Sequence, residues 1–451
     1  MGEKQGDGGI AHVVAVNMGY GHERPAHALR CLAVGGEVII ANDYPGIPDA
    51  DRALWHTTQT WYERISRLSA LPLVGQVAFK LFDQIQHIPE FYPRRDLSAP
   101  SLEVRELAMI IRSRGFLKHL IDRLAHNPKP LITTYFAVAM AAEEFAYPAD
   151  IYLLVTDADM NRVWAPVHPK KSRIKYFAPT GRVAERLKLY GIRESQIHLT
   201  GYPLPREAIG GLEPIILKAD LARRLCNLDP QGVFAEHASH MLEATLDAKT
   251  CRRASGRASK ISLTFAIGGA GAQREIGITI AKSLASAILD GRIRLNLVAG
   301  TRPEVAEYFR VHLMKLGLAS ALKSGGVRII LADSRAAYFA AFNKLMQETD
   351  ILWTKPSELA FYTGLGLPVI IAPTVGSQED FNRRWLTQIG GGIDQLDPRY
   401  THEWLFDWIN AGALARAAWL GFIDAPTHGA YRIEDIVLGR PNSIHALPSI
   451  I

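Results

Sequence analysis

Two glycine-rich turns carry the residue types in this chain that are best suited to chemistry. The first turn follows an apolar run at 12–16 and contains Gly19 and Gly21, with His22 and Arg24 directly after them. Glycines between a strand and a helix let the backbone approach a ligand closely. A histidine titrates near neutral pH and can transfer a proton, although a lone histidine is more often structural. We predict that His22 and Arg24 lie at the mouth of a sheet, with His22 catalytic.

The second turn has the features of a phosphate-binding loop. An apolar run at 261–267 leads into Gly268, Gly269, Ala270, Gly271, Ala272 and Gln273. A helical pattern then spans Arg274 to Leu289. Backbone N–H groups of such a loop can reach a phosphate that side chains would exclude, and the helix N-terminus adds a positive dipole end. A tight turn in a sheet is the alternative, but the flanking strand and helix favour phosphate binding.

Polar residues follow two further apolar runs in the same half of the chain. They are Lys355, Ser357 and Glu358 after the run at 351–353, and Gln378, Glu379 and Asn382 after the run at 368–372. Ligands of open parallel sheets bind at the carboxyl ends of the strands, so we expect these side chains at the binding mouth. Ser357 is predicted to cap a helix that begins near Glu358. Glu358 either accepts hydrogen bonds from a ribose diol or serves only as a first-turn acid.

A pair of carboxylates follows the run at 151–156. Asp157 and Asp159 stand one residue apart, a spacing that invites a metal site. No third acidic residue lies nearby, and we therefore predict no bound metal. A structural role, or a role in positioning or deprotonating an acceptor, is the better interpretation for Asp157.

These candidate residues require a scaffold of buried parallel strands. Short apolar runs rich in β-branched residues alternate with helical patterns, as in parallel sheets that are covered on both faces. Two series of such runs predict an α/β protein with two doubly wound, Rossmann-like domains. The first series is 12–16, 38–41, 131–134, 151–156 and 197–199, and the second is 261–267, 293–299, 327–331, 351–353 and 368–372.

The domain boundaries follow from the region between the two series. Residues 215–228 and 234–248 have helical patterns, and 249–260 is basic and rich in Ser, Gly and Arg, which is typical of a flexible connection. We predict an N-terminal domain at 1–205, a helical insertion and linker at 206–260, and a C-terminal domain at 261–451. The last helices are able to pack back on the N-terminal domain.

Composition bounds the class of protein. The 451 residues include 48% hydrophobic and 21% charged residues, which is ordinary for a globular protein. A net charge of +6 is too small to indicate nucleic acid as a partner, although it suits an anionic membrane surface. The three cysteines share no close spacing, so neither a disulfide framework nor a zinc site is expected. We see no signal peptide and no run long enough to span a membrane.

Basic residues alternate with aromatic residues between Trp61 and Pro130. The aromatic residues are Trp61, Tyr62, Phe79, Phe82, Phe91, Tyr92 and Phe116. Basic residues beside exposed aromatic rings suit contact with lipid headgroups, whereas buried rings would only form core. We therefore expect a cytoplasmic protein that is able to bind the inner face of the membrane peripherally.

Taken in order along the chain, these motifs resemble glycosyltransferase family 28, which includes the monogalactosyldiacylglycerol synthases and the processive diacylglycerol glucosyltransferases. The matching segments are Gly19–His22, Val155–Asp157 with Trp164, 178–203, Gly268–Ala272, Ala299–Arg302, Thr354–Pro356, Gly366–Pro368 and Gln378–Asn382. The resemblance implies a GT-B fold, with two Rossmann-like domains facing across a cleft. It also implies acceptor contacts at Gly19, Gly21, Arg24, Asn161 and Trp164, and donor contacts at the second-half residues above together with Gly300 and Arg302.

The chain departs from the family pattern at three places. The segment between Lys355 and Pro368 is about two residues shorter, so a rigid alignment puts the family's ribose-binding glutamate near Phe361. Glu358 takes that role if the loop shifts. Many relatives carry a histidine where this chain has Asn161, and the insertion at 206–260 is larger than expected.

The resemblance implies a nucleotide-sugar glycosyltransferase without metal or cofactor. The reaction would be a single inverting displacement from a donor, with uridine diphosphate as the favoured leaving group, to a lipid or other hydroxyl acceptor. His22 or Asp157 would deprotonate or orient the acceptor. Two alternatives remain open: an epimerase of the same architecture, and a non-catalytic protein that binds a nucleotide sugar or a partner.

Overall fold

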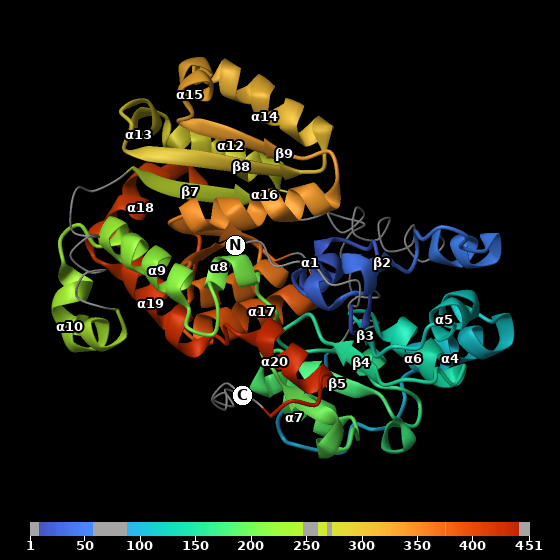
Figure 1. The fold of residues 1–451 in the computed structure, drawn as a ribbon. Helices are drawn as coiled ribbons and strands as arrows, with labels where there is room; N and C mark the ends of the chain where they lie inside the picture. The colour runs from blue at the N-terminus through green and yellow to red at the C-terminus, as the bar shows by residue number, and fades with distance from the viewer. Residues whose placement is uncertain (1–8, 57–87, 247–259, 268–272, 375, 442–451) are drawn as a thin grey trace. The chain divides into compact units, whose positions relative to one another are not determined.

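Two parallel sheets of six strands each form the framework of the described chain (Figure 1). The computed structural model describes residues 9–56, 88–246, 260–267, 273–374 and 376–441. The first unit comprises 1–203, 375–381 and 428–451, and the second comprises 204–374 and 382–427. The predicted α/β fold class, with two doubly wound Rossmann-like domains, is confirmed.

The first sheet has the strand order β2-β1-β3-β4-β5-β6. Its strands are β1 (His12–Ala15), β2 (Ile39–Ile40), β3 (Leu131–Thr133), β4 (Ile151–Leu154), β5 (Lys175–Ala178) and β6 (Ile197–Leu199). Its helices are α1 (Tyr20–Ala28), α4 (Leu102–Arg114), α5 (Lys118–Ala125), α6 (Phe136–Glu144), α7 (Gly181–Leu189) and α20 (Gly429–Val437). Short 3₁₀ helices are η1 (Arg30–Leu32), η2 (Val34–Gly36), η3 (Arg162–Trp164), η4 (Pro169–Lys171) and η5 (Glu194–Gln196).

Alternation along the strands explains why this sheet is covered on both faces. Val14 packs into one hydrophobic cluster, and its neighbours Val13 and Ala15 pack into another. Side chains of successive strand residues point to opposite faces, so a strand that is apolar throughout must be buried on both. The cluster on the second face is completed by Ala430 and Ile433 of α20, a helix from the far end of the chain.

Three contacts fix α20 to the first unit. A bridge joins Pro203 to His428, and the Arg432 side chain donates a hydrogen bond to the Thr200 carbonyl over 3.3 Å. A Cβ at Gly429 would lie 2.3 Å from the Tyr202 carbonyl oxygen, so only glycine allows this approach. The first unit is therefore built from both ends of the described chain.

The second sheet has the strand order β12-β11-β10-β7-β8-β9. Its strands are β7 (Ile261–Ala266), β8 (Ile293–Gly300), β9 (Val327–Leu331), β10 (Ile351–Thr354), β11 (Val369–Ile371) and β12 (Gly392–Asp394). Its helices are α8 (Arg206–Ile209), α9 (Ile215–Leu228), α10 (Val233–Thr245), α12 (Arg274–Ser283), α13 (Ala285–Leu289), α14 (Pro303–Lys315), α15 (Ala319–Ser324), α16 (Arg335–Glu348), α17 (Ser377–Gln388), α18 (Thr401–Asn410) and α19 (Ala413–Asp424). The 3₁₀ helices are η6 (Glu358–Leu365) and η7 (Pro398–Tyr400). The division between the units falls within α17.

Side chains of helix α9 bind the second sheet at the end where its strands begin. Arg224 is buried and donates hydrogen bonds to the carbonyls of Met346, Thr349 and Leu365 over 2.6–2.8 Å. Arg223 pairs with the buried Asp350, which also accepts from Asn227 over 3.2 Å. Burial raises the pKa of Asp350 above its usual range against the opposing charge of Arg223, and burial lowers the pKa of Arg224 to about 10.

Most predicted elements are confirmed, and the structure corrects the predictions at two points. The helix predicted over Arg274–Leu289 is interrupted at Leu284, where α12 ends and α13 follows. Strands β5 and β12 were not predicted, because each is short and begins at Lys175 or Gly392 rather than in an apolar run. The connection predicted at 249–260 falls almost wholly outside the described residues.

Candidate functional site

The mouth of the first sheet lies where its strand order reverses, between β1 and β3. Ligands of doubly wound sheets bind at the carboxyl ends of the strands beside such a switch point. Gly19 ends the turn after β1 with φ of 99°, a left-handed conformation that favours glycine, and α1 begins at the next residue. His22 and Gly21 stand in the first turn of that helix. Chain direction and strand order thus bring His22 to the switch point.

A hydrogen bond across the switch point fixes the His22 imidazole. Its Nδ1 lies 2.7 Å from the carbonyl oxygen of Thr134, the residue after β3, and the Thr134 hydroxyl donates back to the His22 carbonyl over 2.9 Å. A carbonyl oxygen only accepts, so Nδ1 carries the proton. In the neutral ring Nε2 then holds the lone pair and is the nitrogen that can take up a proton.

Aromatic rings surround this imidazole. The ring centre of Tyr135 lies 5.2 Å away in an edge-to-face arrangement, and that of Trp164 lies 6.3 Å away. Phe136, half-buried, lies 5.5 Å from Trp164. Burial raises the pKa of Tyr135 well above its usual value, so its hydroxyl stays protonated at neutral pH. Thr134 and Tyr135 were not predicted as site residues, although their place directly after β3 was a usable signal.

An ion pair holds the segment that follows β4. Arg186 of α7 donates to both carboxylate oxygens of Asp159, each over 2.8 Å, and both side chains are almost fully buried. The Thr180 hydroxyl donates to the Ala158 carbonyl over 3.0 Å, and the Tyr190 hydroxyl donates to the Met160 carbonyl over 2.9 Å. These contacts give Asp159 a structural role and fix the segment that carries the half-buried Asp157.

Asn161 follows this segment and precedes η3, the turn that carries Trp164. It is 9% exposed, and its Oδ1 has no hydrogen-bond partner among the described residues. A buried acceptor without a donor costs free energy, about 1–3 kcal/mol. A hydroxyl or amide donor that reached Asn161 Oδ1 would remove this cost. Arg24, also predicted here, is buried, with its guanidinium 5.9 Å from the ring centre of Tyr20.

The mouth of the second sheet lies between β7 and β10, where that strand order reverses. Gly268, Gly269, Ala270, Gly271 and Ala272 fall outside the described residues, which resume at Gln273 directly before α12. A Cβ at Gly277 would lie 2.9 Å from the Phe265 ring, so glycine lets α12 pack close against the sheet. The helix N-terminus is consequently held at the carboxyl end of β7, as a phosphate site of this kind requires.

Lys355, Ser357 and Glu358 follow β10 on the other side of the same switch point. Lys355 is half-buried, and Glu358 is buried as the first residue of η6. A helix, η6, begins at Glu358 as predicted, with Ser357 at its N-cap position. The prediction that Ser357 caps this helix is wrong, because its side chain makes no capping hydrogen bond. Phe361, the rigid-alignment position of the family's glutamate, packs on Trp385 with ring centres 4.9 Å apart, so it belongs to the core.

The remaining predicted donor residues follow β8 and β11. Gly300 ends β8 with φ of 68°, and Arg302 lies 3.6 Å from the Glu304 carboxylate at the start of α14. The other three lie on α17, where Gln378 and Glu379 are half-buried and Asn382 is fully buried. All of these residues thus follow the carboxyl ends of strands.

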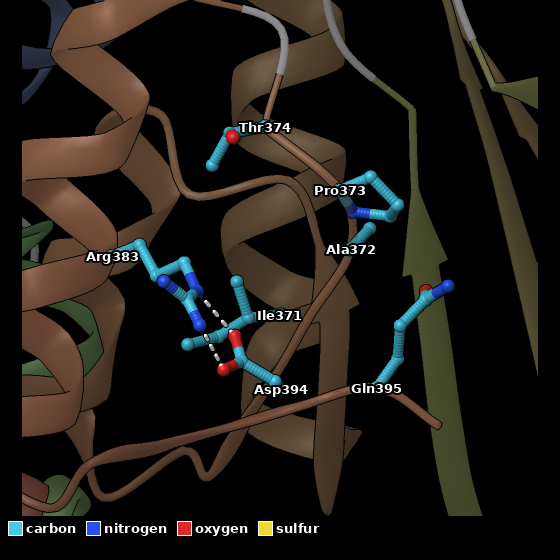
Figure 2. Close-up of a pocket in the computed structure, with 7 residues that line it drawn as sticks. All are labelled: Ile371, Ala372, Pro373, Thr374, Arg383, Asp394 and Gln395. Atoms are coloured by element: carbon cyan, nitrogen blue, oxygen red, sulfur yellow. Dashed lines mark hydrogen bonds and ion pairs between the residues drawn. The ribbon is translucent and has the colours of Figure 1, made fainter. Parts of the chain in front are cut away.

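A pocket of about 270 Å³ opens at the carboxyl ends of β11 and β12 (Figure 2). Its lining residues are Ile371, Ala372, Pro373, Thr374, Arg383, Asp394 and Gln395. The guanidinium of Arg383 and the carboxylate of Asp394 point toward each other and form a two-pronged ion pair, with Nε 2.6 Å from Oδ1. Sequence reasoning missed this pocket, because its charged residues come from α17 and from β12, a strand that was not predicted.

Two side chains anchor the rim of this pocket. The Trp353 indole donates to Gln395 Oε1 over 2.8 Å, which fixes the orientation of that amide. The Gln273 amide donates to the Pro373 carbonyl over 2.8 Å. The residue that ends the predicted phosphate loop is thereby tied to the pocket.

Among the described residues, no three His, Cys, Asp or Glu side chains are grouped as metal ligands. No helix in the described ranges is long and apolar enough to cross a membrane. Of the aromatic residues predicted to contact lipid, Phe91 and Phe116 are buried and Tyr92 is 62% exposed; Trp61, Tyr62, Phe79 and Phe82 lie outside the described ranges.

Comparisons with known proteins give a family model and several solved structures. The model, described as "Domain of unknown function (DUF6938)", matches residues 235–403. No curated protein matches.

The solved structures that resemble this chain share little sequence with it. A UDP-GlcNAc 2-epimerase from Neisseria meningitidis, bound to UDP-GlcNAc, is 15% identical; 81% of this chain and 88% of that chain are covered, with a TM-score of 0.43. A UDP-GlcNAc 2-epimerase from Methanocaldococcus jannaschii is 13% identical, with 95% of this chain and 99% of that chain covered and a TM-score of 0.40. MurG from Acinetobacter baumannii is 11% identical, with 95% of this chain and 99% of that chain covered and a TM-score of 0.42. The assignment of this chain to the two-domain α/β class rests on the strand orders of its two sheets.

Proposed function

We propose that this protein is a GT-B glycosyltransferase that transfers a sugar from a nucleotide diphosphate sugar, with uridine diphosphate as leaving group, to a hydroxyl acceptor. The observation that carries the proposal is the His22 imidazole at the switch point of the first sheet. Its Nδ1 donates to the Thr134 carbonyl, so Nε2 is the nitrogen able to act as a base.

The proposed reaction is a single displacement. Nε2 of His22 takes the proton of the acceptor hydroxyl, whose oxygen attacks the anomeric carbon as the bond to the diphosphate oxygen breaks. The configuration at that carbon inverts. Asp157 and Asn161 are proposed to position the acceptor, because both follow β4 at the mouth of the first sheet.

The second switch point supports the donor half of the proposal. The departing diphosphate gains one negative charge, which spreads over its oxygens, and a helix N-terminus and a lysine stabilise that charge. The start of α12, held close to the sheet by Gly277, and Lys355 after β10 provide these groups. Glu358 is proposed to accept hydrogen bonds from the ribose, and no metal is assigned a role.

A His22→Gln variant tests the base. We expect turnover to fall about 10²- to 10⁴-fold, the range that general base catalysis contributes. The rise of kcat/KM with pH should also disappear, while thermal stability is retained. His126→Gln is the matched control, because His126 makes the same Nδ1-to-carbonyl bond, over 2.7 Å to Asp122, on the exposed end of α5. Retention of wild-type turnover and pH profile in His22→Gln would remove the proposal for the base.

The donor class is tested first on the wild-type protein. We expect uridine diphosphate sugars to raise the melting temperature in a thermal-shift panel. Incubation with donor alone then separates transfer from epimerisation, because an epimerase interconverts the sugar without an acceptor. If neither uridine nor guanosine diphosphate sugars bind, the enzymatic proposal fails.

A lipid acceptor and peripheral contact with an anionic membrane complete the proposal. Among the described aromatic residues predicted to contact lipid, Tyr92 has the exposed ring. Co-sedimentation with vesicles should rise with anionic lipid and fall with salt, because salt screens surface attraction. Independence of both variables would remove the membrane from the proposal.

A further inference from the structure

The pocket beside β11 and β12 has no role in the proposed transfer described so far. None of its seven lining residues is among the site residues that the family resemblance implies. Its volume of about 270 Å³ lies just below the range that takes a drug-sized ligand, so it suits a single ring. The pocket therefore calls for a ligand smaller than a whole nucleotide.

The charges of the lining favour a neutral ligand. Arg383 and Asp394 are the only charged residues among the seven, and their ion pair leaves no net charge. A charged ligand gains nothing from such a pair, because attraction to one partner is offset by repulsion from the other. The rest of the lining is apolar at Ile371, Ala372 and Pro373, with polar groups at Thr374 and Gln395.

The ion pair also specifies what the ligand donates. A carboxylate has about four lone-pair sites, and Arg383 occupies two of them on Asp394. The others can accept two hydroxyl hydrogens, and hydrogen bonds to a charged acceptor are the stronger kind. A neutral ring with several hydroxyl donors and an apolar face meets these requirements, and a pyranose is such a ring.

Stability does not account for the ion pair. The two side chains are 44% and 45% exposed, and exposed pairs contribute little, about 0–1 kcal/mol. Variants of this pair are therefore expected to fold, which makes the pocket accessible to experiment.

We propose that the Arg383–Asp394 pocket binds a neutral pyranose ring, with Asp394 accepting hydrogen bonds from its hydroxyls. Two sources supply such a ring: the sugar of the nucleotide-sugar donor, or a glycoside in the acceptor. The donor source rests on the proposed function, and it is favoured by the bond from Gln273 to Pro373, which ties the end of the predicted phosphate loop to the pocket rim.

The test compares three ligands with wild type and Asp394→Asn. Titration calorimetry measures affinity for uridine diphosphate and for uridine diphosphate sugars, and NMR line broadening detects methyl hexopyranosides. We expect Asp394→Asn to bind the nucleotide sugars about 10- to 100-fold more weakly and to bind uridine diphosphate as wild type does. Arg383→Met should likewise weaken binding of the nucleotide sugars and leave binding of uridine diphosphate unchanged. Glu307→Gln is the matched control, because Glu307 pairs with Arg310 on an exposed face of α14 in the same unit.

The outcomes separate the two sources from failure. If Asp394→Asn loses only the response to methyl hexopyranosides, the pyranose site holds and the ring comes from a glycoside acceptor. Wild type that binds no nucleotide at all overturns the proposed function, and the hexopyranoside arm still decides the pocket. The pyranose site is overturned if Asp394→Asn matches wild type for all three ligands, or if it loses uridine diphosphate and nucleotide sugars equally.

Discussion

The two units hold arginine contacts at opposite ends of their strands, through Arg186 in the first unit and through Arg223 and Arg224 in the second. In the first unit, Arg186 binds Asp159 beside the carboxyl ends of the strands, where it fixes the segment leading to Asn161. In the second unit, Arg223 pairs with Asp350 and Arg224 donates to the Thr349 carbonyl, both at the end where the strands begin. A buried ion pair is costly to break, so each unit is rigid where its arginines lie. The first unit is thus stabilised at the carboxyl ends of its strands and the second at the ends where its strands begin.

The largest effect is expected from breaking the pair at the mouth. Arg186→Leu leaves the Asp159 carboxylate buried without its partner, which should lower the free energy of unfolding of the first unit by about 3–5 kcal/mol. Activity should fall with it, because the segment carrying Asn161 loses its anchor. Urea unfolding and steady-state kinetics measure both. Replacing Asp159 and Arg186 together with leucine should restore much of the stability, and equal losses in the single and double variants would contradict this account.

A smaller effect is expected at the other edge. Arg224→Met removes the donor to three buried carbonyls and should cost about 1–3 kcal/mol, the penalty for buried groups left without partners. Nucleotide-sugar affinity, measured by calorimetry below the unfolding transition, should stay at the wild-type value. Weaker binding in a folded Arg224→Met protein would show that contacts where the strands begin affect binding at their carboxyl ends, contrary to this expectation.

Two buried asparagines, one in each unit, differ in the hydrogen bonds that their side chains make. Asn161 and Asn296 each have an Oδ1 without a partner in the described chain, but the Asn296 amide nitrogen donates to Ser262 and Thr264 over 3.1 Å each. Asn161→Leu should therefore raise the free energy of unfolding, by about 1 kcal/mol, and lower turnover. Asn296→Leu should lower stability, because two hydroxyls lose their donor. Thermal denaturation gives both signs, and a destabilised Asn161→Leu would deny Asn161 its role in binding.

The smallest effect concerns pH. Burial lowers the pKa of His198 on β6 below 6.5, with the Lys175 charge adding to the shift. The unfolded state then binds more protons below about pH 6.5, so acidification destabilises the first unit. His198→Gln should weaken this dependence between neutral pH and pH 5. Identical pH–stability curves for variant and wild type would show that the His198 imidazole titrates alike in both states.

Local sequence predicted the elements well wherever burial shapes the pattern. The run at 261–267 is mostly apolar because β7 is a central strand covered on both faces, and α9 has the predicted bounds. Strand β12 was missed because Gly392–Asp394 holds a single large apolar residue and owes its structure to pairing with β11. Pairing between strands depends on the rest of the sheet, and no short window of sequence contains it.

The candidate site, like the fold, could be predicted only in part from the sequence. The glycine turn pointed to His22, but the proton on its Nδ1 depends on Thr134, 112 residues along the chain. Asp159 stood out as half of a carboxylate pair, and only the fold shows that Arg186 occupies both of its oxygens. Residue types that suit a reaction are visible in sequence. Their protonation and orientation are set by contacts between distant segments, which sequence reasoning did not reach.

The placement of α20 has a consequence for the order of folding during synthesis. The first unit lacks Ala430 and Ile433 of its core until the ribosome has made residues 429–437, whereas every segment of the second unit ends by residue 427. N-terminal domains usually fold first as a chain emerges. In this chain the first unit is completed after the second. One apolar face of its sheet therefore stays uncovered until α20 has been synthesised.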